Sequence, residues 1–294
     1  MRRVGLFLLL FTVTCIAQQR PAITGIALVR MYTADPAAST AFYNGKLGFD
    51  RTSKEGVAHY AVNDSQWLEV APLPSPGPQS RIAAIAFTTR NAAALQSYLK
   101  AHAVTIDQPL HNGSFAVHDP EGHLVMFVQQ RPVSMKPISP RATARRIIHT
   151  GFMVKDRAAE DHFYREVLGF RPYWYGGRKE GELDYVSSQV PDGTDWIEYM
   201  LNRDPNPDPK QLGSMNHISL GVAHMSDAIE ALARNGCTTR ECTAANTHTG
   251  RDGKVQLNLF DPDLTRVEFM EFKPSGTTCC SPFTGPAPTE KENR

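Results

Sequence analysis

Four polar residues in the C-terminal half of the chain stand inside otherwise apolar runs. They are two histidines and two glutamates: His149, Glu198, His217 and Glu268. Each run is typical of a β-strand, so each offers one polar side chain to an apolar layer. A buried imidazole or carboxylate is costly unless it is paired or ligates a metal. Two imidazoles and two carboxylates that met from four strands would suit a hard-to-borderline divalent cation.

The order of the predicted elements favours such a meeting. A helical segment follows each of the two histidines, at 158–168 and 227–234. Strand-like runs come after each helix, which gives the pattern β-α-β-β-β twice. A histidine lies on the first strand of each unit and a glutamate on the last, separated by 49 residues (149 to 198) and 51 residues (217 to 268). We therefore predict that the four side chains surround one site.

The N-terminal half, 24–130, repeats this architecture. Matching landmarks are Phe42-Tyr43 and Phe163-Tyr164, Trp67-Leu68-Glu69 and Trp196-Ile197-Glu198, and Asp119-Pro120 and Asp261-Pro262. The matched copies place Leu28, Glu69, Ala84 and Met126 opposite the four polar residues. Three of these four are apolar, so we expect the first copy to be a scaffold that holds no metal in the same way. We expect Glu69 to be solvated or hydrogen-bonded.

Several segments resemble the glyoxalase/bleomycin-resistance/extradiol-dioxygenase superfamily, also called vicinal oxygen chelate proteins. They are HTGFMVKDRAAEDHFYREVLGF, DWIEYM, MNHISLGVAHMSDAIEALARNG and DPDLTRVEFMEF. The resemblance implies an α+β fold of two tandem domains, each a pair of βαβββ modules that form a curved mixed sheet around a cleft. It also implies one divalent metal ion, and its ligand positions fall on His149, Glu198, His217 and Glu268. Zn, Ni, Fe, Mn and Co all tolerate such ligands.

The resemblance suggests three functions. The first, which the sequence favours, is a lyase or isomerase similar to lactoylglutathione lyase. There a metal stabilises an enolate of a small oxygenated substrate, and Glu198 or Glu268 acts as the base. The second is an Fe(II) ring-cleaving dioxygenase of the extradiol type, with His149, His217 and Glu268 as ligands.

In that second interpretation His248 lies roughly where the family keeps an acid–base histidine, although we favour a simple loop histidine at this position. Asn258 stands where the family has a tyrosine, and Glu198 would be surplus. The third function is a ligand-binding resistance protein. Such proteins lack the metal ligands, so the set of four argues against it.

Composition limits the partners. The chain has 294 residues, of which 41% are hydrophobic and 21% charged, as in soluble globular proteins. A net charge of +1 gives no argument for nucleic acid or an anionic membrane surface. We expect a small-molecule substrate as the partner, and the oligomeric state stays open.

The first residues carry a basic start, an apolar run and a small residue at Ala17, which together predict a secretory signal peptide and a periplasmic or secreted protein. Export permits disulfides among the cysteines that remain, and the sequence leaves their pairing open: Cys237, Cys242, Cys279 and Cys280. The predicted organisation is a signal peptide, a degenerate domain, a linker, a metal-binding domain and a disordered tail, over 1–17, 24–130, 131–146, 147–272 and 273–294.

Overall fold

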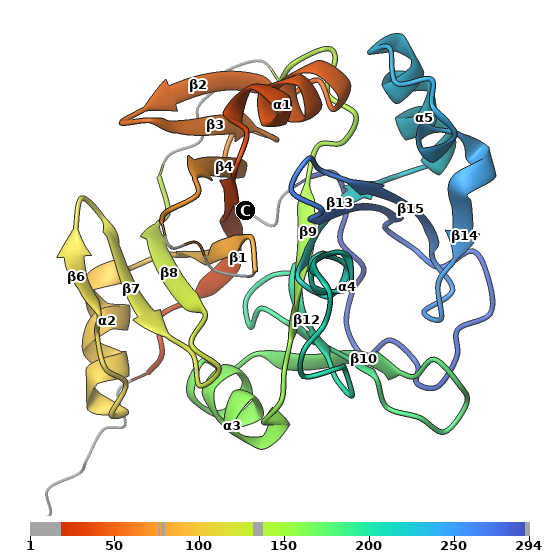
Figure 1. Ribbon diagram of the computed structural model, residues 1–294. Helices are drawn as coiled ribbons and strands as arrows, with labels where there is room; N and C mark the ends of the chain where they lie inside the picture. Colours follow the sequence, from red (N-terminus) through yellow and green to blue (C-terminus); the bar gives the residue numbers. More distant parts are fainter. Residues whose placement is uncertain (1–18, 76, 78–79, 132–137, 292–294) are drawn as a thin grey trace, which may run out of the picture.

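The structure is a computed structural model that describes residues 19–75, 77, 80–131 and 138–291. The predicted signal peptide lies outside the described residues, as do 132–137 of the predicted linker and the last three residues of the tail. The two halves of the chain each form one eight-stranded sheet (Figure 1). The predicted α+β architecture of two tandem domains is confirmed.

The first sheet has the strand order β2-β3-β4-β1-β5-β8-β7-β6. β1 is parallel to β4 and antiparallel to β5, and β5 is parallel to β8, so the sheet is mixed. Two βαβββ modules therefore meet at β1 and β5. The strands are β1 (Ile23–Thr33), β2 (Asp50–Lys54), β3 (Val57–Ala61), β4 (Trp67–Pro72), β5 (Ile82–Thr89), β6 (Gln108–His111), β7 (Ser114–His118) and β8 (Leu124–Gln129).

The second sheet repeats this order as β10-β11-β12-β9-β13-β16-β15-β14. Its two modules meet at β9 and β13, which are antiparallel to each other. On the outer sides, β12 runs parallel to β9 and β16 runs parallel to β13. The strands are β9 (Ile147–Met153), β10 (Arg171–Gly176), β11 (Tyr185–Gln189), β12 (Trp196–Met200), β13 (His217–Val222), β14 (Thr247–Thr249), β15 (Val255–Phe260) and β16 (Arg266–Glu271).

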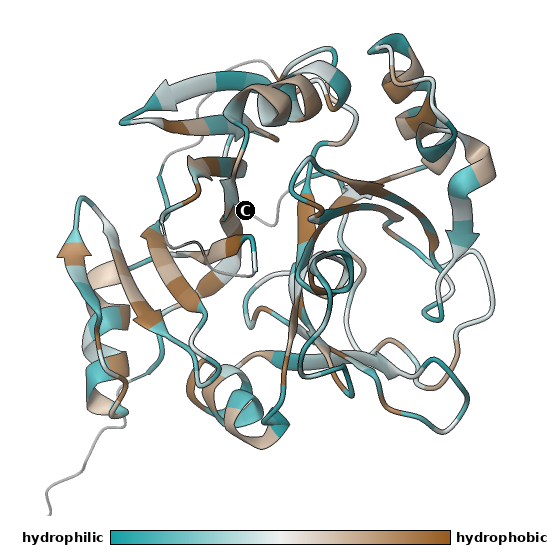
Figure 2. Ribbon diagram, viewed as in Figure 1, coloured by the Kyte–Doolittle hydropathy of each residue, from teal (hydrophilic) through white to brown (hydrophobic). Residues whose placement is uncertain are grey.

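Alternation along the strands separates the core from the site. Ile197 and Tyr199 on β12 and Ile218 and Leu220 on β13 belong to the main hydrophobic core. The residues between them point to the opposite face of the sheet, because successive strand residues alternate. Figure 2 shows the hydrophobic residues gathered along strands such as β8 and β9. One face of the second sheet therefore packs into the hydrophobic core, and the polar side chains lie on the opposite face.

The helices are short. They are α1 (Pro36–Thr40), η1 (Ala41–Lys46), α2 (Ala92–Ala101), α3 (Arg157–Asp161), η2 (His162–Val167), α4 (Pro209–Met215), α5 (Met225–Arg234), η3 (Arg240–Cys242) and η4 (Ala244–Asn246). The helix predicted at 158–168 is an α-helical turn that continues as the π-helical segment η2. Gly169 ends it with a φ of +77°, in the left-handed region that glycine tolerates. Among the described residues, no helix has the length and apolar character needed to cross a membrane.

Two equivalent contacts join the domains. Tyr43 of the first domain donates a hydrogen bond to Asp261 of the second, over 2.8 Å. Tyr164 of the second domain donates to Asp119 of the first, over 3.1 Å. The sequence repeat relates these two tyrosines and these two aspartates to each other. Each domain therefore offers the same tyrosine to the other domain's Asp-Pro turn.

The C-terminal tail differs from the expected disorder over its described part, 273–291. Its backbone carbonyls accept hydrogen bonds from Trp174, Gln189 and Arg146. Phe283 lies against the ring of Tyr173 with centroids 4.9 Å apart. Composition suggested a mobile segment, but these contacts with residues far away in the sequence hold the tail on the second domain.

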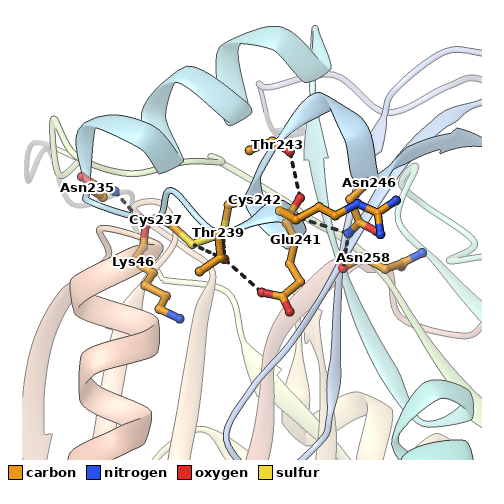
Figure 3. The surroundings of a disulfide bond; sticks show 10 residues. Lys46, Asn235, Cys237, Thr239, Glu241, Cys242, Thr243, Asn246 and Asn258 are labelled. Atoms are coloured by element: carbon orange, nitrogen blue, oxygen red, sulfur yellow. Dashed lines mark hydrogen bonds between the residues drawn. A yellow bond between two sulfur atoms is a disulfide. The ribbon is translucent and has the colours of Figure 1, made fainter.

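Two disulfides form within the described residues, and each joins cysteines close in sequence. Cys237 pairs with Cys242 in the connection after α5, and Cys279 pairs with Cys280 in the tail. Figure 3 shows the first disulfide beside Thr239, with Asn235 reaching Lys46 of the first domain. The pairing that the sequence left open is thereby assigned in the structure.

Candidate metal centre

The four polar residues singled out from the sequence lie on one face of the second sheet. Glu198 on β12 and His217 on β13 are both paired with Gly151, which lies between them on β9. His149 is paired with Ser219 on β13, and Ser219 with Glu268 on β16. The four side chains therefore come from the four central strands, at adjacent positions.

Three of the four converge on one point. The Nε2 atoms of His149 and His217 lie 3.1 Å apart, and Glu268 Oε2 lies 3.3 Å from His149 Nε2. Ligand atoms of these three residues all lie within 4.8 Å of one another. Glu198 stands at the edge of this triad, with Oε2 3.7 Å from His217 Nε2 and its side chain 15% exposed. None of the four points to the outer surface.

Gly151 makes room for the triad. A Cβ atom at this position would overlap the ring of His217, which lies across β9. The Trp196 ring stacks on the ring of His149, with centroids 4.7 Å apart. His217 Nδ1 lies 3.1 Å from the carbonyl oxygen of Met215. This contact favours the tautomer in which Nε2 keeps its lone pair.

The protonation states suit a cation. Burial, with the nearby positive charges of Lys254 and Arg266, lowers the pKa of His149 well below its usual value. Burial and Arg266 do the same for His217. Both imidazoles are therefore neutral, and their Nε2 atoms face each other. Glu268 Oε2 is buried and accepts no hydrogen bond from the part of the chain that the structure describes. A divalent ion among these acceptors would satisfy all three, so the donor set fits a metal.

Glu198 has a different environment. Burial, and then the negative charge of Glu268, raises its pKa to about 8. Its Oε1 atom lies 3.5 Å from the hydroxyl of Ser187, at the limit of a hydrogen bond. A carboxyl with a pKa near neutral can both accept and return a proton. Glu198 is therefore suited either to proton transfer or to ligation.

A cavity of about 310 Å³ opens beside the triad. Glu198 and Glu268 reach its wall, and so does His248 on β14, whose side chain is exposed. Asn258 is paired with Glu268 across β15 and β16. Its Oδ1 atom is buried and has no hydrogen-bond partner within the described ranges. The predicted acid–base histidine therefore stands at the cavity wall rather than among the converging ligands.

Three cations near the site were not found from the sequence. Arg203 and Arg266 line the cavity. Lys254 is fully buried, with Nζ 4.4 Å from the Trp196 ring centroid and 4.9 Å from that of Phe283. Arg266 lies two residues before Glu268 on one strand, so alternation alone could have placed both on the same face. No local pattern marks the other two.

The first domain has replaced the corresponding site with an ion pair. Leu28 and Trp67 are paired as His149 and Trp196 are, which supports the predicted match of positions. Arg30 stands where the second domain has Gly151, and its Nε lies 2.6 Å from Glu69. Glu69 also accepts a hydrogen bond from Trp67. The expectation that Glu69 is hydrogen-bonded is therefore confirmed, and the described part of this domain contains no comparable group of metal-ligating residues.

Comparisons with solved structures identify the same fold in dioxygenases. One is a variant of homoprotocatechuate 2,3-dioxygenase from B. fuscum in complex with HPCA, with a TM-score of 0.65 and 19% identity over 87% of this chain and 72% of that chain. Another is the anaerobic complex of the Brevibacterium fuscum enzyme with 3,4-dihydroxyphenylacetate, with a TM-score of 0.65 and 18% identity over 92% and 84%. The Arthrobacter globiformis enzyme gives 0.64 and 19% over 88% and 84%.

The sequence comparisons agree with the fold. No curated protein matched the chain. The family profile described as Glyoxalase/Bleomycin resistance protein/Dioxygenase superfamily matches twice, over residues 25–127 and 146–269. The two matches fall on the two sheets and together span most of the chain, so this protein belongs to the glyoxalase/bleomycin resistance protein/dioxygenase superfamily.

Proposed function

We propose that the chain is a mononuclear metal-dependent enzyme that cleaves the ring of a small catechol-type substrate in the extradiol manner. The observation that carries this proposal is the convergence of His149, His217 and Glu268 while Glu198 stays at the edge. Two histidines and one carboxylate with open positions are the ligand set of non-haem Fe(II) oxygenases. The dioxygenase fold of the compared structures supports the proposal as an analogy only.

Fe(II) held by the triad would supply open positions for two neighbouring substrate oxygens and the redox chemistry that ring cleavage requires. The protein's own groups do the remaining work. Met215 and Trp196 fix the two imidazole rings. Glu198 is placed to take the proton that a catechol hydroxyl loses on binding and to return it later, since its pKa is about 8. His248 at the cavity wall is a second candidate for proton transfer.

The lyase or isomerase remains a second candidate because of the position of Glu198. Its Oε2 atom lies 3.7 Å from His217 Nε2. A small rotation would make it a fourth ligand, and Zn, Ni, Mn or Co would then suit the site as well as Fe. In that case Glu198 or Glu268 would act as the base toward an enolate. The non-catalytic resistance protein is disfavoured by the intact triad.

The test begins with the metal content of the purified protein, measured by mass spectrometry. Protein reconstituted anaerobically with Fe(II) is then mixed with catechols, and oxygen uptake and ring-opened product are recorded. In parallel, protein loaded with Zn or Ni is tested for hemithioacetal turnover. We expect oxygen uptake with Fe(II) and no hemithioacetal turnover. The reverse result would establish the second candidate instead.

Matched variants locate the activity. His149→Ala should lose metal and oxygen uptake together, whereas His162→Ala should keep both, because His162 is a surface residue paired with Glu166. Wild-type protein that binds no divalent metal would contradict both enzyme proposals.

We also propose that the protein is exported. The signal pattern over residues 1–17 and the two disulfides support an oxidising compartment. The test is mass spectrometry of protein expressed with its leader in a bacterial host. Export predicts a periplasmic protein whose mature chain begins at Gln18 and carries no free thiol. A full-length cytoplasmic chain would contradict it.

A further inference from the structure

Three arginines line the cavity beside the triad, and two of them, Arg203 and Arg266, keep unused hydrogen-bond donors. Arg203 follows β12, and Arg266 opens β16 on the same face as Glu268. Both guanidinium groups are close enough to contribute to the electrostatics of the site. A group bound in this cavity therefore lies beside both positive charges.

These guanidinium groups have unused donors. Nε and Nη2 of Arg203 and Nε of Arg266 are buried and have no hydrogen-bond partner among the residues that the structure describes. Arginine stays charged at any accessible pH, so it cannot escape this cost by losing a proton. An unsatisfied buried donor is costly, and the cost is greater when the group is charged. A ligand that supplied acceptor oxygens would recover this energy.

The free donors of Arg203 form one edge of its guanidinium plane. Nε and Nη2 point in parallel and match the two oxygens of a carboxylate. The plane is held over the ring of Tyr185, with Cζ 4.9 Å from the centroid. Within the described part of the chain Arg203 forms no ion pair, and the ring stabilises its charge in part.

Other cations in the cavity wall are engaged. Arg251 donates to the carbonyl oxygen of Gly177 and to Cys279 Sγ. Arg266 Nη1 lies 3.7 Å from Glu268 Oε1, whereas its Nε has no hydrogen-bond partner among the described residues. A divalent ion at the triad would offset the charge of Glu268 and reduce the hold of that carboxylate on Arg266. Although Glu198, Asp252 and Glu268 also line the cavity, three arginines and a divalent ion would then leave it with a net positive charge next to the reacting centre.

We propose that the substrate carries a carboxylate, which Arg203 binds through its Nε and Nη2 edge with Arg266 as the second positive charge. The inference deepens the proposed function and rests on it for the role of the cavity as a substrate site. It limits the substrate class to small aromatic or oxygenated acids, held by the carboxylate at one end and by the triad at the other. Neutral analogues of the same shape should bind less well.

The experiment compares acids with matched neutral compounds by calorimetry. The protein is loaded with Zn, which supports binding without redox turnover. The chelating pair is 3,4-dihydroxybenzoate and its methyl ester, and the non-chelating pair is benzoate and benzamide. We expect each acid to bind wild-type protein at least about tenfold tighter than its neutral partner, as suits a charge-assisted bidentate contact.

The variants separate the arginine from general charge. Arg203→Gln should reduce the ratio of acid to ester affinity to about one, while the affinity for the ester and the metal content stay unchanged. Arg203→Lys should give an intermediate ratio of acid to ester affinity, because lysine keeps the positive charge but lacks the two parallel N–H donors of the guanidinium group. Arg90→Gln removes the same charge from an exposed position in the first domain and should leave the ratio unchanged.

The outcomes distinguish this inference from the proposed function. An equal affinity for acid and ester, failure of both pairs to bind, or an unchanged ratio in Arg203→Gln would overturn the carboxylate assignment even if catechol turnover were found. Conversely, the benzoate and benzamide pair does not require the metal. A preference for benzoate that depends on Arg203 would uphold the anion site in a protein that failed to bind metal or to consume oxygen.

Discussion

Gly151 determines where the His217 ring can lie. It is paired with both Glu198 and His217, and a Cβ atom there would overlap the imidazole. We expect Gly151→Ala to displace the ring and weaken metal binding by at least about tenfold, since ligand geometry must hold within a few tenths of an ångström. Calorimetric titration with Zn measures this. Gly45→Ala is the control, because its Cβ meets no atom within 4 Å. Unchanged affinity in Gly151→Ala would contradict this account of the site.

The carboxyl groups make metal affinity depend on pH. Glu198 has a pKa of about 8 and the pKa of Glu268 is also raised, both chiefly by burial. Below pH 8 a proton on Glu198 competes with a cation at the triad, whereas the neutral histidines bring no proton to displace. Affinity should therefore rise from pH 6 to 8, by up to about tenfold per pH unit for each proton released.

Titration in buffers of different ionisation enthalpy counts the released protons. Glu198→Gln should reduce that count by one at pH 7 and flatten the pH profile. A profile as steep in Glu198→Gln as in wild-type protein would mean that Glu198 holds no proton that a cation displaces.

At the scale of elements, the strands and the two modules could be predicted because their signals are local. Alternation marks each strand, and the separations of 49 and 51 residues follow from one module repeated (149 to 198 and 217 to 268). α4 is not among the helices predicted from the sequence, because it begins at Pro209 in a proline-rich stretch. Its signals were nevertheless present: Asp208 caps the helix, Gln211 completes a capping box, and proline suits the first turn.

The tail could not be predicted because its stability comes from distant partners. Its composition is typical of a mobile segment, and nothing in 273–291 indicates that Tyr173, Trp174 or Lys254 will lie beneath it. The ring of Phe283 lies 4.9 Å from that of Tyr173 and 4.9 Å from Lys254 Nζ. Trp196 continues this cluster to His149. The tail therefore contacts the cluster of aromatic rings that packs against the metal-site residue His149.

We expect Phe283→Ala to lower the free energy of unfolding of the second domain by about 1–3 kcal/mol, less than for a fully buried phenylalanine because this ring is half-buried. Denaturant unfolding monitored by tryptophan fluorescence measures it, since Trp174 and Trp196 lie in or beside the cluster. Leu110→Ala, at an exposed position on β6, should cost little. A Phe283→Ala protein as stable as wild type would show that the tail adds nothing to the domain.

At the scale of the whole molecule, duplication has produced two domains with different roles. The second keeps a small residue at Gly151 and the triad around it. The first has Arg30 at the matching place, and this arginine neutralises Glu69. From the sequence we expected no metal site of the same kind in the first domain, because Leu28, Ala84 and Met126 cannot ligate a metal. The sequence could not predict the ion pair, since Arg30 is not one of the four matched positions.

The two exchanged tyrosine contacts are among the interactions that stabilise the interface between the two domains. Burial, together with the facing aspartate, keeps the pKa of Tyr43 and of Tyr164 well above the usual value, so both hydroxyls remain donors. Tyr43→Phe would leave Asp261 Oδ2 without its donor, and Tyr164→Phe would remove one from Asp119. Each substitution should lower the free energy of unfolding by about 1–3 kcal/mol, the usual cost of an unsatisfied buried acceptor.

Because the two contacts share no residue, the double variant should lose the sum of the two single losses. Denaturant unfolding of the four proteins measures this, with Tyr175→Phe as the control, since that side chain is 53% exposed. Losses that are equal in the two single variants and additive in the double would support a symmetric interface in which each domain stabilises the other. A loss in only one single variant would instead show that the interface, like the metal site, has become specialised on one side.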